Sequence, residues 1–193
     1  MRNSRKNNKK ISMKRWRFIS FDDGFGKNFA CIVGCITAGS EIEGFVYSTI
    51  EIDGFDVTHK IISLVNTSKF KKQIKCIFLG GITFAGFNIA DIHEISNKTG
   101  KPVVVIMRKR PNFDRIKNAL KNLSNYEKRM ELIKKAGEIR RVSDLYIQVH
   151  GCSFESAKEF IECSKSKGKI PEGLRIAHLV ASAIVHGESK KGS

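Results

Sequence analysis

Two adjacent carboxylates, Asp22 and Asp23, follow the first apolar segment of the chain and directly precede Gly24. Carboxylate oxygens are ligands that Mg²⁺ and Mn²⁺ prefer, and such an ion can activate water and stabilise the charge that develops during phosphodiester cleavage. An Asp-Asp-Gly triplet is also common in turns. Because the triplet follows the first predicted strand, a metal site and a simple turn both remain open interpretations.

Three further aspartates lie near the starts of predicted helices. Asp56 precedes a helical apolar pattern and is a natural N-cap, although that helix start could also bring its carboxylate to a metal. Asp53 lies just before it, and Asp91 is expected one turn into a later helix, where a carboxylate suits the helix dipole. The candidate metal ligands are therefore Asp22, Asp23, Asp56 and Asp91.

Cations and glycines supply candidate contacts to phosphate. Arg108, Lys109 and Arg110 end a predicted buried strand, so they could form a rigid phosphate site; a solvated charge run is the alternative. Residues 80–88 include three glycines and lead to a helix predicted to start at Asn88, where free N–H groups would suit an anion. This loop lacks the lysine of a P-loop, so nucleotide hydrolysis is not supported. The candidate nucleic-acid or phosphate contacts are Gly81, Thr83, Gly86, Asn88, Arg108, Arg110 and Arg175.

The elements that must position these residues form an α/β pattern. Apolar or alternating segments predict strands at 16–21, 29–37, 41–52, 74–79, 102–107 and 144–149. Helical spacing and capping residues predict helices at 57–68, 88–99, 112–123, 125–136, 153–165 and 172–187. Short turns join the first three strands, and helix–strand crossovers follow. This order predicts a ribonuclease H-like mixed sheet, with three antiparallel strands, then parallel strands, and helices on both faces.

Length and composition indicate one globular unit. The chain has 193 residues, of which 41% are hydrophobic, so we expect a single domain at 15–193 after a flexible basic tail at 1–14. There is no signal-peptide pattern and no apolar run long enough for a membrane span, so we expect a cytoplasmic protein without a membrane partner. The five irregularly spaced cysteines predict buried thiols at Cys31, Cys35 and Cys76 rather than a zinc or redox site.

The charge distribution favours a nucleic-acid partner. The net charge is +16, and residues 1–17 carry eight Lys or Arg side chains without a carboxylate. Such cations can neutralise phosphates and release counterions. A solvated tail, or adaptation of the surface to high temperature, would produce a similar composition. Composition does not decide between DNA and RNA, nor does it determine the oligomeric state.

Six ordered segments of the chain resemble the mostly archaeal endonuclease dU family, at 21–24, 52–58, 81–92, 100–111, 171–183 and 187–189. That family is similar to endonuclease V, which has the ribonuclease H-like fold and uses Mg²⁺ to nick DNA or RNA beside deaminated bases. The resemblance implies a Mg²⁺- or Mn²⁺-dependent endonuclease acting on uracil-containing DNA. It also implies catalytic roles for Asp22 or Asp23, for Asp56 and for Lys109, which should then converge within one cleft.

Two positions depart from the endonuclease V pattern. Gly80 stands where that family has a second metal aspartate, and His178 replaces an aspartate of the last helix. From its apolar neighbours alone, His178 is expected to be a core residue. A site with fewer carboxylates would bind metal more weakly, unless Asp53 or Asp91 compensates. Two other functions therefore stay open: nucleic-acid binding without cleavage, and binding of a small phosphate compound by the glycine loop and the cations that follow it.

Overall fold

The computed structural model describes residues 16–189, and the predicted basic tail lies outside that range. The described residues form a mixed seven-stranded sheet in the order β3-β2-β1-β4-β7-β9-β8. The first five strands in this order agree with the ribonuclease H-like prediction, because β1, β2 and β3 are antiparallel neighbours while β4 and β7 continue the sheet in parallel with β1. Their bounds are Arg17–Phe25 for β1, Ala30–Ala38 for β2, Glu41–Thr49 for β3, Ile74–Leu79 for β4 and Val103–Met107 for β7.

Two antiparallel strands extend the sheet beyond β7. β9 (Leu145–His150) pairs with β7, and β8 (Arg140–Val142), which was not predicted, pairs with β9. Outside this sheet, β5 (Thr83–Phe84) and β6 (Asn88–Ile89) form a small antiparallel ribbon within the glycine-rich loop. The loop is therefore an ordered structure that links β4 to the next helix.

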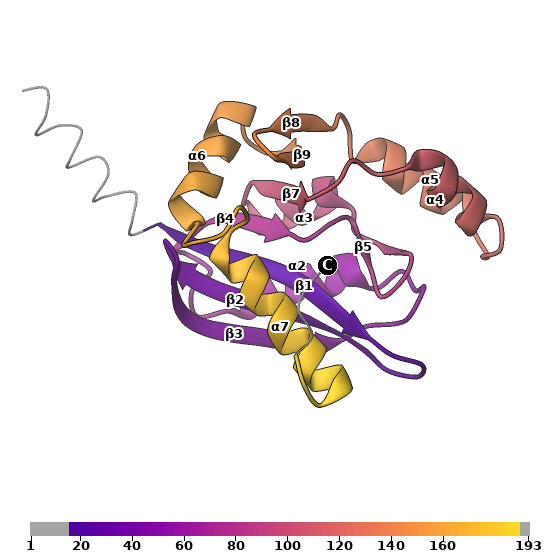
Figure 1. Ribbon diagram of the computed structural model, residues 1–193, viewed down its shortest axis with the longest axis horizontal. Coiled ribbons are helices and arrows are strands. Elements are labelled where there is room, and N and C mark those ends of the chain that lie inside the picture. Colours follow the sequence, from indigo (N-terminus) through magenta and orange to yellow (C-terminus); the bar gives the residue numbers. More distant parts are fainter. Residues whose placement is uncertain (1–15, 190–193) are drawn as a thin grey trace, which may run out of the picture.

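Helices cover both faces of the sheet, as predicted (Figure 1). On one face, α2 (Val57–Thr67) and α3 (Ile92–Thr99) pack on the inward side chains of the strands, and Ile19 and Phe21 of β1 belong to this cluster. On the other face, α6 (Phe154–Ser164) covers the far strands while α7 (Glu172–His186) crosses β1 and β2. No helix of the described chain is both long enough and apolar enough to cross a lipid bilayer.

The remaining helices, α4 (Phe113–Leu120) and α5 (Tyr126–Lys135), follow β7 and lie at one side of the sheet in Figure 1. Their apolar side chains form a separate small cluster with Ile89 of β6. The helices α4 and α5 therefore pack on the glycine-rich loop, which makes them part of its support.

The prediction that Cys31, Cys35 and Cys76 are buried is confirmed.

The first strand is longer than predicted. We expected it to end at Phe21, with residues 22–24 in a turn, but β1 continues to Phe25. Asp22 pairs with Val33 and Asp23 with Ile32 on β2, and the pairing ends with Phe25 opposite Ala30. Cross-strand hydrogen bonds to β2 therefore outweigh the local turn preference of aspartate and glycine. As a result, the two carboxylates stand on a paired central strand.

The helix predicted at 88–99 begins later. α3 starts at Ile92, and Asp91 is its N-cap, accepting hydrogen bonds from the backbone N–H groups of His93 and Glu94. Asn88 is instead a fully buried residue of β6. The predicted helix start at Asn88 is therefore wrong, because α3 begins only after Asp91, whose carboxylate accepts N–H groups of its first turn.

Candidate active site

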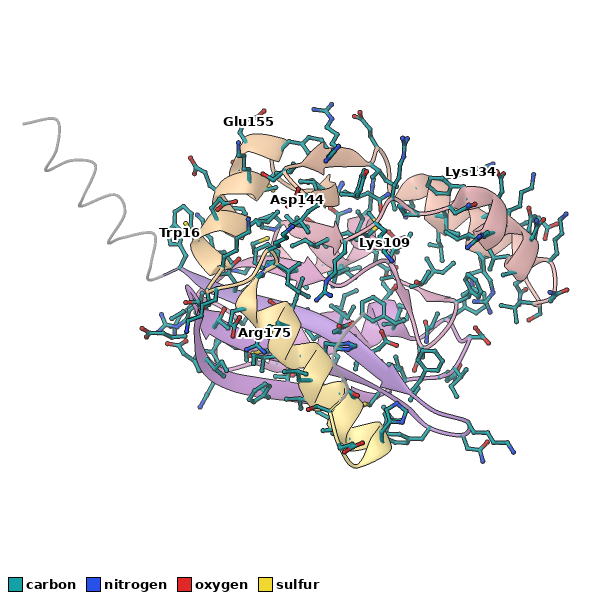
Figure 2. All side chains as sticks on the ribbon, in the orientation of Figure 1. Trp16, Lys109, Lys134, Asp144, Glu155 and Arg175 are labelled. Carbon is teal, nitrogen blue, oxygen red and sulfur yellow. The ribbon has the colours of Figure 1, made fainter. Side chains whose placement is uncertain are left out.

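A cavity of about 880 Å³ lies along α7, at the edge where β1, β4 and β7 end. These strands are parallel to one another, so their carboxyl-terminal ends meet at this edge. Figure 2 labels Lys109, which follows β7, and Arg175 on α7; both line the cavity. The polar and charged lining residues are Asp22, Asp23, Arg108, Lys109, Arg175, His178, Ser182 and His186. Carboxylates and cations thus share a volume large enough for a substantial ligand.

The carboxylate of Asp22 has close contacts on two sides. Its Oδ2 lies 3.1 Å from Nδ1 of His178, and its Oδ1 accepts the backbone N–H of Asp23 at 3.0 Å. A Cβ atom at Gly80 would lie only 3.0 Å from that same Oδ1. The absence of a side chain at position 80 therefore leaves the space that the Asp22 carboxylate occupies. An aspartate there would require the Asp22 carboxylate to move by a few tenths of an ångström.

Asp23 lies on the other side of β1, toward the glycine-rich loop. Its Oδ2 accepts the backbone N–H of Ala85 at 2.7 Å. Burial first, and then the negative charge of Asp22, raise the pKa of Asp23 to about 6. A cation near Asp23 would favour the ionised form of its carboxylate. The electrostatics therefore fit a divalent ion near this pair.

A metal at this site would have few protein ligands. Asp22 and Asp23 are the residues that would hold it, and Mg²⁺ is commonly bound by one or two carboxylates together with water and phosphate oxygens. Among residues 16–189, no group of three or more His, Cys, Asp or Glu side chains is arranged to hold a metal. The fit is thus to an ion that is completed by water and a bound phosphate rather than to a closed protein cage.

His178 is not the core residue that we expected. Its side chain is 37% exposed and lines the cavity. The hydrogen bond to Asp22 raises the pKa of His178, although burial and the charge of Arg108 oppose protonation. Sequence reasoning missed it because its immediate neighbours are apolar. The available signal was the recurrence of Arg175, His178, Ser182 and His186 at intervals of three or four, which places polar side chains on one helix face.

Of the three basic residues that follow β7, the fold places two at the cavity. Arg108 and Lys109 are exposed and line the cavity, whereas Arg110 is exposed but is not among the lining residues. Arg175 reaches the cavity from α7, and its guanidinium forms an ion pair with Glu172 at 2.5 Å. The cavity is therefore lined by cations from two different elements, the end of β7 and α7.

Asp56 and Asp91 do not line the cavity. Oδ1 of Asp56 accepts hydrogen bonds from the backbone N–H of Glu51 at 3.2 Å and from the side-chain amide of Asn88 at 2.6 Å. Asp91 caps α3 and forms an ion pair with Lys135 at 2.5 Å. Its buried position would raise its pKa, but these hydrogen bonds lower it. Both carboxylates are thus engaged in structural contacts, and the predicted convergence of three residues lacks Asp56.

The predicted phosphate contacts in the glycine-rich loop also lie outside the cavity. They are Gly81, Thr83, Gly86 and Asn88. The loop instead supports the carboxylate of Asp23 through Ala85. The backbone N–H of Asp53 donates to the Ala85 carbonyl at 2.9 Å, and Oδ1 of Asp53 accepts the N–H of Phe87 at 2.7 Å. The segment before α2 therefore holds the loop, and the loop holds one side of the candidate metal site.

A buried cation, Arg129 on α5, joins the same two segments. Its side chain is among the largest fully buried ones in the described chain, and the residue is 2% exposed. The guanidinium donates to the backbone carbonyls of Asp53, Gly54 and Phe87, and it stacks 4.2 Å from the ring centroid of Phe55. A guanidinium has enough donors to bind several carbonyls at once. No sequence motif identified this residue, because its partners are backbone atoms of distant segments.

The two raised pKa values predict a specific pH dependence of stability. In a metal-free, chelator-containing buffer, the pKa of Asp23 is about 6 when folded but near its ordinary value of 3.8 when unfolded. The protonated carboxyl group therefore stabilises the folded state fully below the pKa of the unfolded chain, and this contribution is lost as the pH rises through about 6. The raised pKa of His178 acts in the same direction. We therefore expect thermal melts to show lower stability at about pH 8 than at about pH 5.

The variant Asp23→Asn isolates one contribution to this trend. Asparagine keeps an oxygen for the N–H of Ala85 but does not ionise. It should therefore be more stable than the wild type at high pH and close to it at low pH. If the wild type and Asp23→Asn lost the same stability between these pH values, burial of an ionised Asp23 would not be the cause.

Comparisons of sequence give one consistent set of relatives. The sequence model of the family described as "Endonuclease dU" matches residues 14–185. A UPF0215 protein of Archaeoglobus fulgidus is 51% identical over 178 residues, which cover 92% of this chain and 98% of that protein. The UPF0215 protein PF2042 of Pyrococcus furiosus is 42% identical over 184 residues, covering 91% and 95% of the two chains. These likenesses span nearly all of both partners.

Comparisons of structure extend the likeness to more distant proteins. A crystal structure from Archaeoglobus fulgidus is 50% identical, with a TM-score of 0.87 and coverage of 89% of this chain and 99% of that chain. Human ENDOV has a TM-score of 0.61 at 16% identity, with coverage of 95% and 98%. Endonuclease V of Ciona intestinalis, in complex with a 24mer DNA containing an inosine followed by a ribo-adenosine, has a TM-score of 0.55 at 12% identity and covers 91% and 94%. At these low identities the likeness shows the fold, and the predicted ribonuclease H-like architecture is confirmed.

Proposed function

Because this chain belongs to the endonuclease dU family, we propose that it is a divalent-metal-dependent endonuclease that cuts DNA at deaminated, uracil-containing positions. The observation that carries this proposal is the shared cavity of Asp22, Asp23, Arg108 and Lys109. Carboxylates are required to hold a metal, and cations are required to bind a phosphodiester. The cavity brings both kinds of group together at the end of the sheet.

Five side chains of the cavity have roles in this proposal. Asp22 and Asp23 would hold a Mg²⁺ or Mn²⁺ ion, which would supply an activated water and polarise the phosphoryl group. The hydrogen bond of His178 orients Asp22. Lys109 and Arg108 bind the non-bridging oxygens of the phosphate from the end of β7. Asp56, although predicted to be catalytic, is assigned no step, because its carboxylate binds Glu51 and Asn88.

The similarity of this chain to the matching family and to an endonuclease V structure supports a deaminated base as the substrate. The matching family is described as endonuclease dU, and the Ciona intestinalis neighbour was crystallised with inosine-containing DNA. The assay that tests the proposal uses purified protein with Mg²⁺ or Mn²⁺ and end-labelled oligonucleotides that contain uracil, hypoxanthine or no lesion. We expect metal-dependent nicking of the uracil strand, abolished by a chelator. Absence of nicking on every oligonucleotide with both ions would refute the proposal.

A second function, binding to nucleic acid without cleavage, is favoured by one observation. Among the described residues, only two carboxylates line the cavity, and Gly80 stands where the resemblance to endonuclease V implies a further metal aspartate. The same assay separates the two functions, since a binding protein would retain a labelled strand in a salt-dependent manner but leave it intact. Binding without nicking would therefore select this alternative, whereas nicking would exclude it.

Lys109 should contribute one phosphate contact to binding. We expect Lys109→Gln to weaken binding of every oligonucleotide regardless of the lesion, and to reduce the slope of log affinity against log salt by about 1. Fluorescence anisotropy between about 50 and 200 mM salt measures this slope. Lys72→Gln is the matched control, because Lys72 is exposed but precedes β4 and so lies at the opposite edge of the sheet. An equal change in both variants would assign the effect to net charge alone.

A further inference from the structure

The hairpin between β1 and β2 exposes two phenylalanines, of which Phe25 lines the cavity. Phe25 is 48% exposed and Phe29 is 39% exposed, with exposed Lys27 in the turn between them. Neither ring belongs to the buried hydrophobic clusters of the described residues. In Figure 1 this indigo hairpin projects past α7 and away from the rest of the sheet. Stabilisation of the core therefore does not account for these two aromatic side chains.

Close packing against α7 fixes the position of this hairpin. A Cβ atom at Gly24 would lie 2.4 Å from the carbonyl oxygen of Ala181, and one at Gly26 would lie 3.3 Å from a methyl group of Val185. These glycines thus allow the hairpin backbone to lie directly on α7. The pairing with β2 continues to the tip, where the N–H of Gly26 donates to the carbonyl of Phe29 at 2.8 Å. The aromatic rings are therefore presented by a supported backbone rather than by a long loop.

The hairpin is continuous with the candidate active site. Phe25 lines the same cavity as Asp23 and follows it by two residues on β1. Residues i and i+2 of a strand share one face and lie about 7 Å apart along it. Adjacent bases of a stacked strand rise by about 3.4 Å, so this spacing corresponds to roughly two base steps. His186, near the end of α7, lines the same cavity.

We propose that Phe25 and Phe29 form a stacking platform for an unpaired base of the substrate strand, within a few nucleotides of the phosphate bound by Lys109. This inference rests on the proposed function and deepens it by assigning a locally unpaired strand as the substrate. Aromatic side chains interleaved with cations are the usual means of holding single-stranded nucleic acid, because every base has a π face and every nucleotide a phosphate. Lys27 supplies the neighbouring cation.

A base fits this hairpin better than a protein partner does. A stable protein interface buries about 800 Å² on each side, whereas this projecting tip offers two rings next to a lysine and a glycine. Electrostatics also favour a polyanion, because the chain has a net charge of +16 and the adjacent cavity contains Arg108 and Lys109. We therefore assign the platform to nucleic acid, and a protein-docking role is one outcome that the test can reveal.

The test combines affinity with photochemical crosslinking. Single-stranded oligonucleotides that contain 5-iodouracil are bound to the full chain, irradiated, and analysed by mass spectrometry for the modified residue. We expect crosslinks at Phe25 or Phe29. The double variant Phe25→Ala/Phe29→Ala should lose these crosslinks and bind the single strand about 10-fold or more weakly, while its affinity for a blunt duplex stays near that of the wild type. Phe25→Trp should retain both binding and crosslinking.

Two controls make the result specific. Phe113→Ala removes another exposed ring, 47% accessible at the start of α4, and should leave all measurements unchanged. Thermal melts verify that the double variant is folded, as expected for exposed side chains. If the double variant bound the single strand as tightly as the wild type does, the proposal would be overturned and a protein-docking role would be the better explanation. An equal loss for single strand and duplex would also overturn it.

The two proposals fail in different ways. If the wild type nicks no oligonucleotide but crosslinks through Phe25 or Phe29, the endonuclease function is wrong while the stacking platform remains. If the wild type nicks uracil-containing DNA and the double variant nicks and binds equally well, the platform is wrong while the endonuclease function remains.

Discussion

Asp22→Asn and Asp23→Asn, made together, are expected to lower metal-dependent nicking at least about 10³-fold, because a metal ion contributes several kcal/mol to charge stabilisation and each 1.36 kcal/mol is a factor of ten in rate. Asparagine preserves the size of each side chain and can still accept the hydrogen bonds from Asp23 N–H and Ala85 N–H. The loss should therefore reflect the missing negative charges. Initial nicking rates at saturating Mn²⁺ measure the effect.

Asp114→Asn is the matched control for this double variant. Asp114 is an exposed carboxylate in the first turn of α4 and does not line the cavity. Its replacement removes one negative charge from the same protein and should change the rate less than about twofold, as is usual for an exposed position. A double variant that nicks at the rate of Asp114→Asn would show that Asp22 and Asp23 do not hold a catalytic metal.

Arg129→Met should produce the largest loss of stability among single substitutions in the support of the site. Methionine fills much of the space but leaves the buried carbonyl of Gly54 and the half-buried carbonyls of Asp53 and Phe87 without this donor. Each unsatisfied buried polar group costs about 1–3 kcal/mol, so we expect a loss of about 3 kcal/mol or more in the free energy of unfolding. Urea denaturation followed by circular dichroism measures it.

Two comparisons test the cause of that loss. Lys134→Met removes an exposed cation from the same helix, as Figure 2 shows, and should change stability by no more than about 0.5 kcal/mol. Arg129→Lys keeps the charge but not the planar arrangement of donors, so it should be intermediate. Because Arg129 supports the loop that binds Asp23, Arg129→Lys should also bind Mn²⁺ more weakly than the wild type. If Arg129→Met were as stable as the wild type, the three carbonyls would not require the guanidinium for the stability of the fold.

Local sequence patterns predicted the sheet well but placed some boundaries incorrectly. Buried strands such as β4 and β7 have continuous apolar runs, which are typical of strands covered on both faces. The end of β1 was placed at Phe21 because Asp-Asp-Gly favours turns, whereas pairing with β2 extends the strand to Phe25. The early start assigned to α3 has a similar cause, since Asn88 is held in β6 by partners before α2 that no local pattern reveals.

The sequence by itself determined the order of the longer strands and of the helices, the family resemblance, and the placement of Asp22, Asp23 and Lys109 near the carboxyl-terminal ends of strands. Parallel strands necessarily bring such ends to one edge of a sheet, so topology was enough to predict that these residues are neighbours. The sequence could not distinguish a structural carboxylate from a site carboxylate at a helix start. Asp56 and Asp91 have the residue type that a metal needs, but their hydrogen-bond partners come from elsewhere in the chain.

Only the tertiary structure decided which side chains complete the site. His178 contacts Asp22 because α7 crosses β1, Gly80 leaves room for the Asp22 carboxylate, and Arg129 binds two distant loops. Each of these contacts joins segments that are far apart in the chain, and their energies depend on distances of a few tenths of an ångström and on burial. Residue type and local spacing contain neither quantity. The fold could therefore be inferred from local patterns, whereas the composition of the site required the packed molecule.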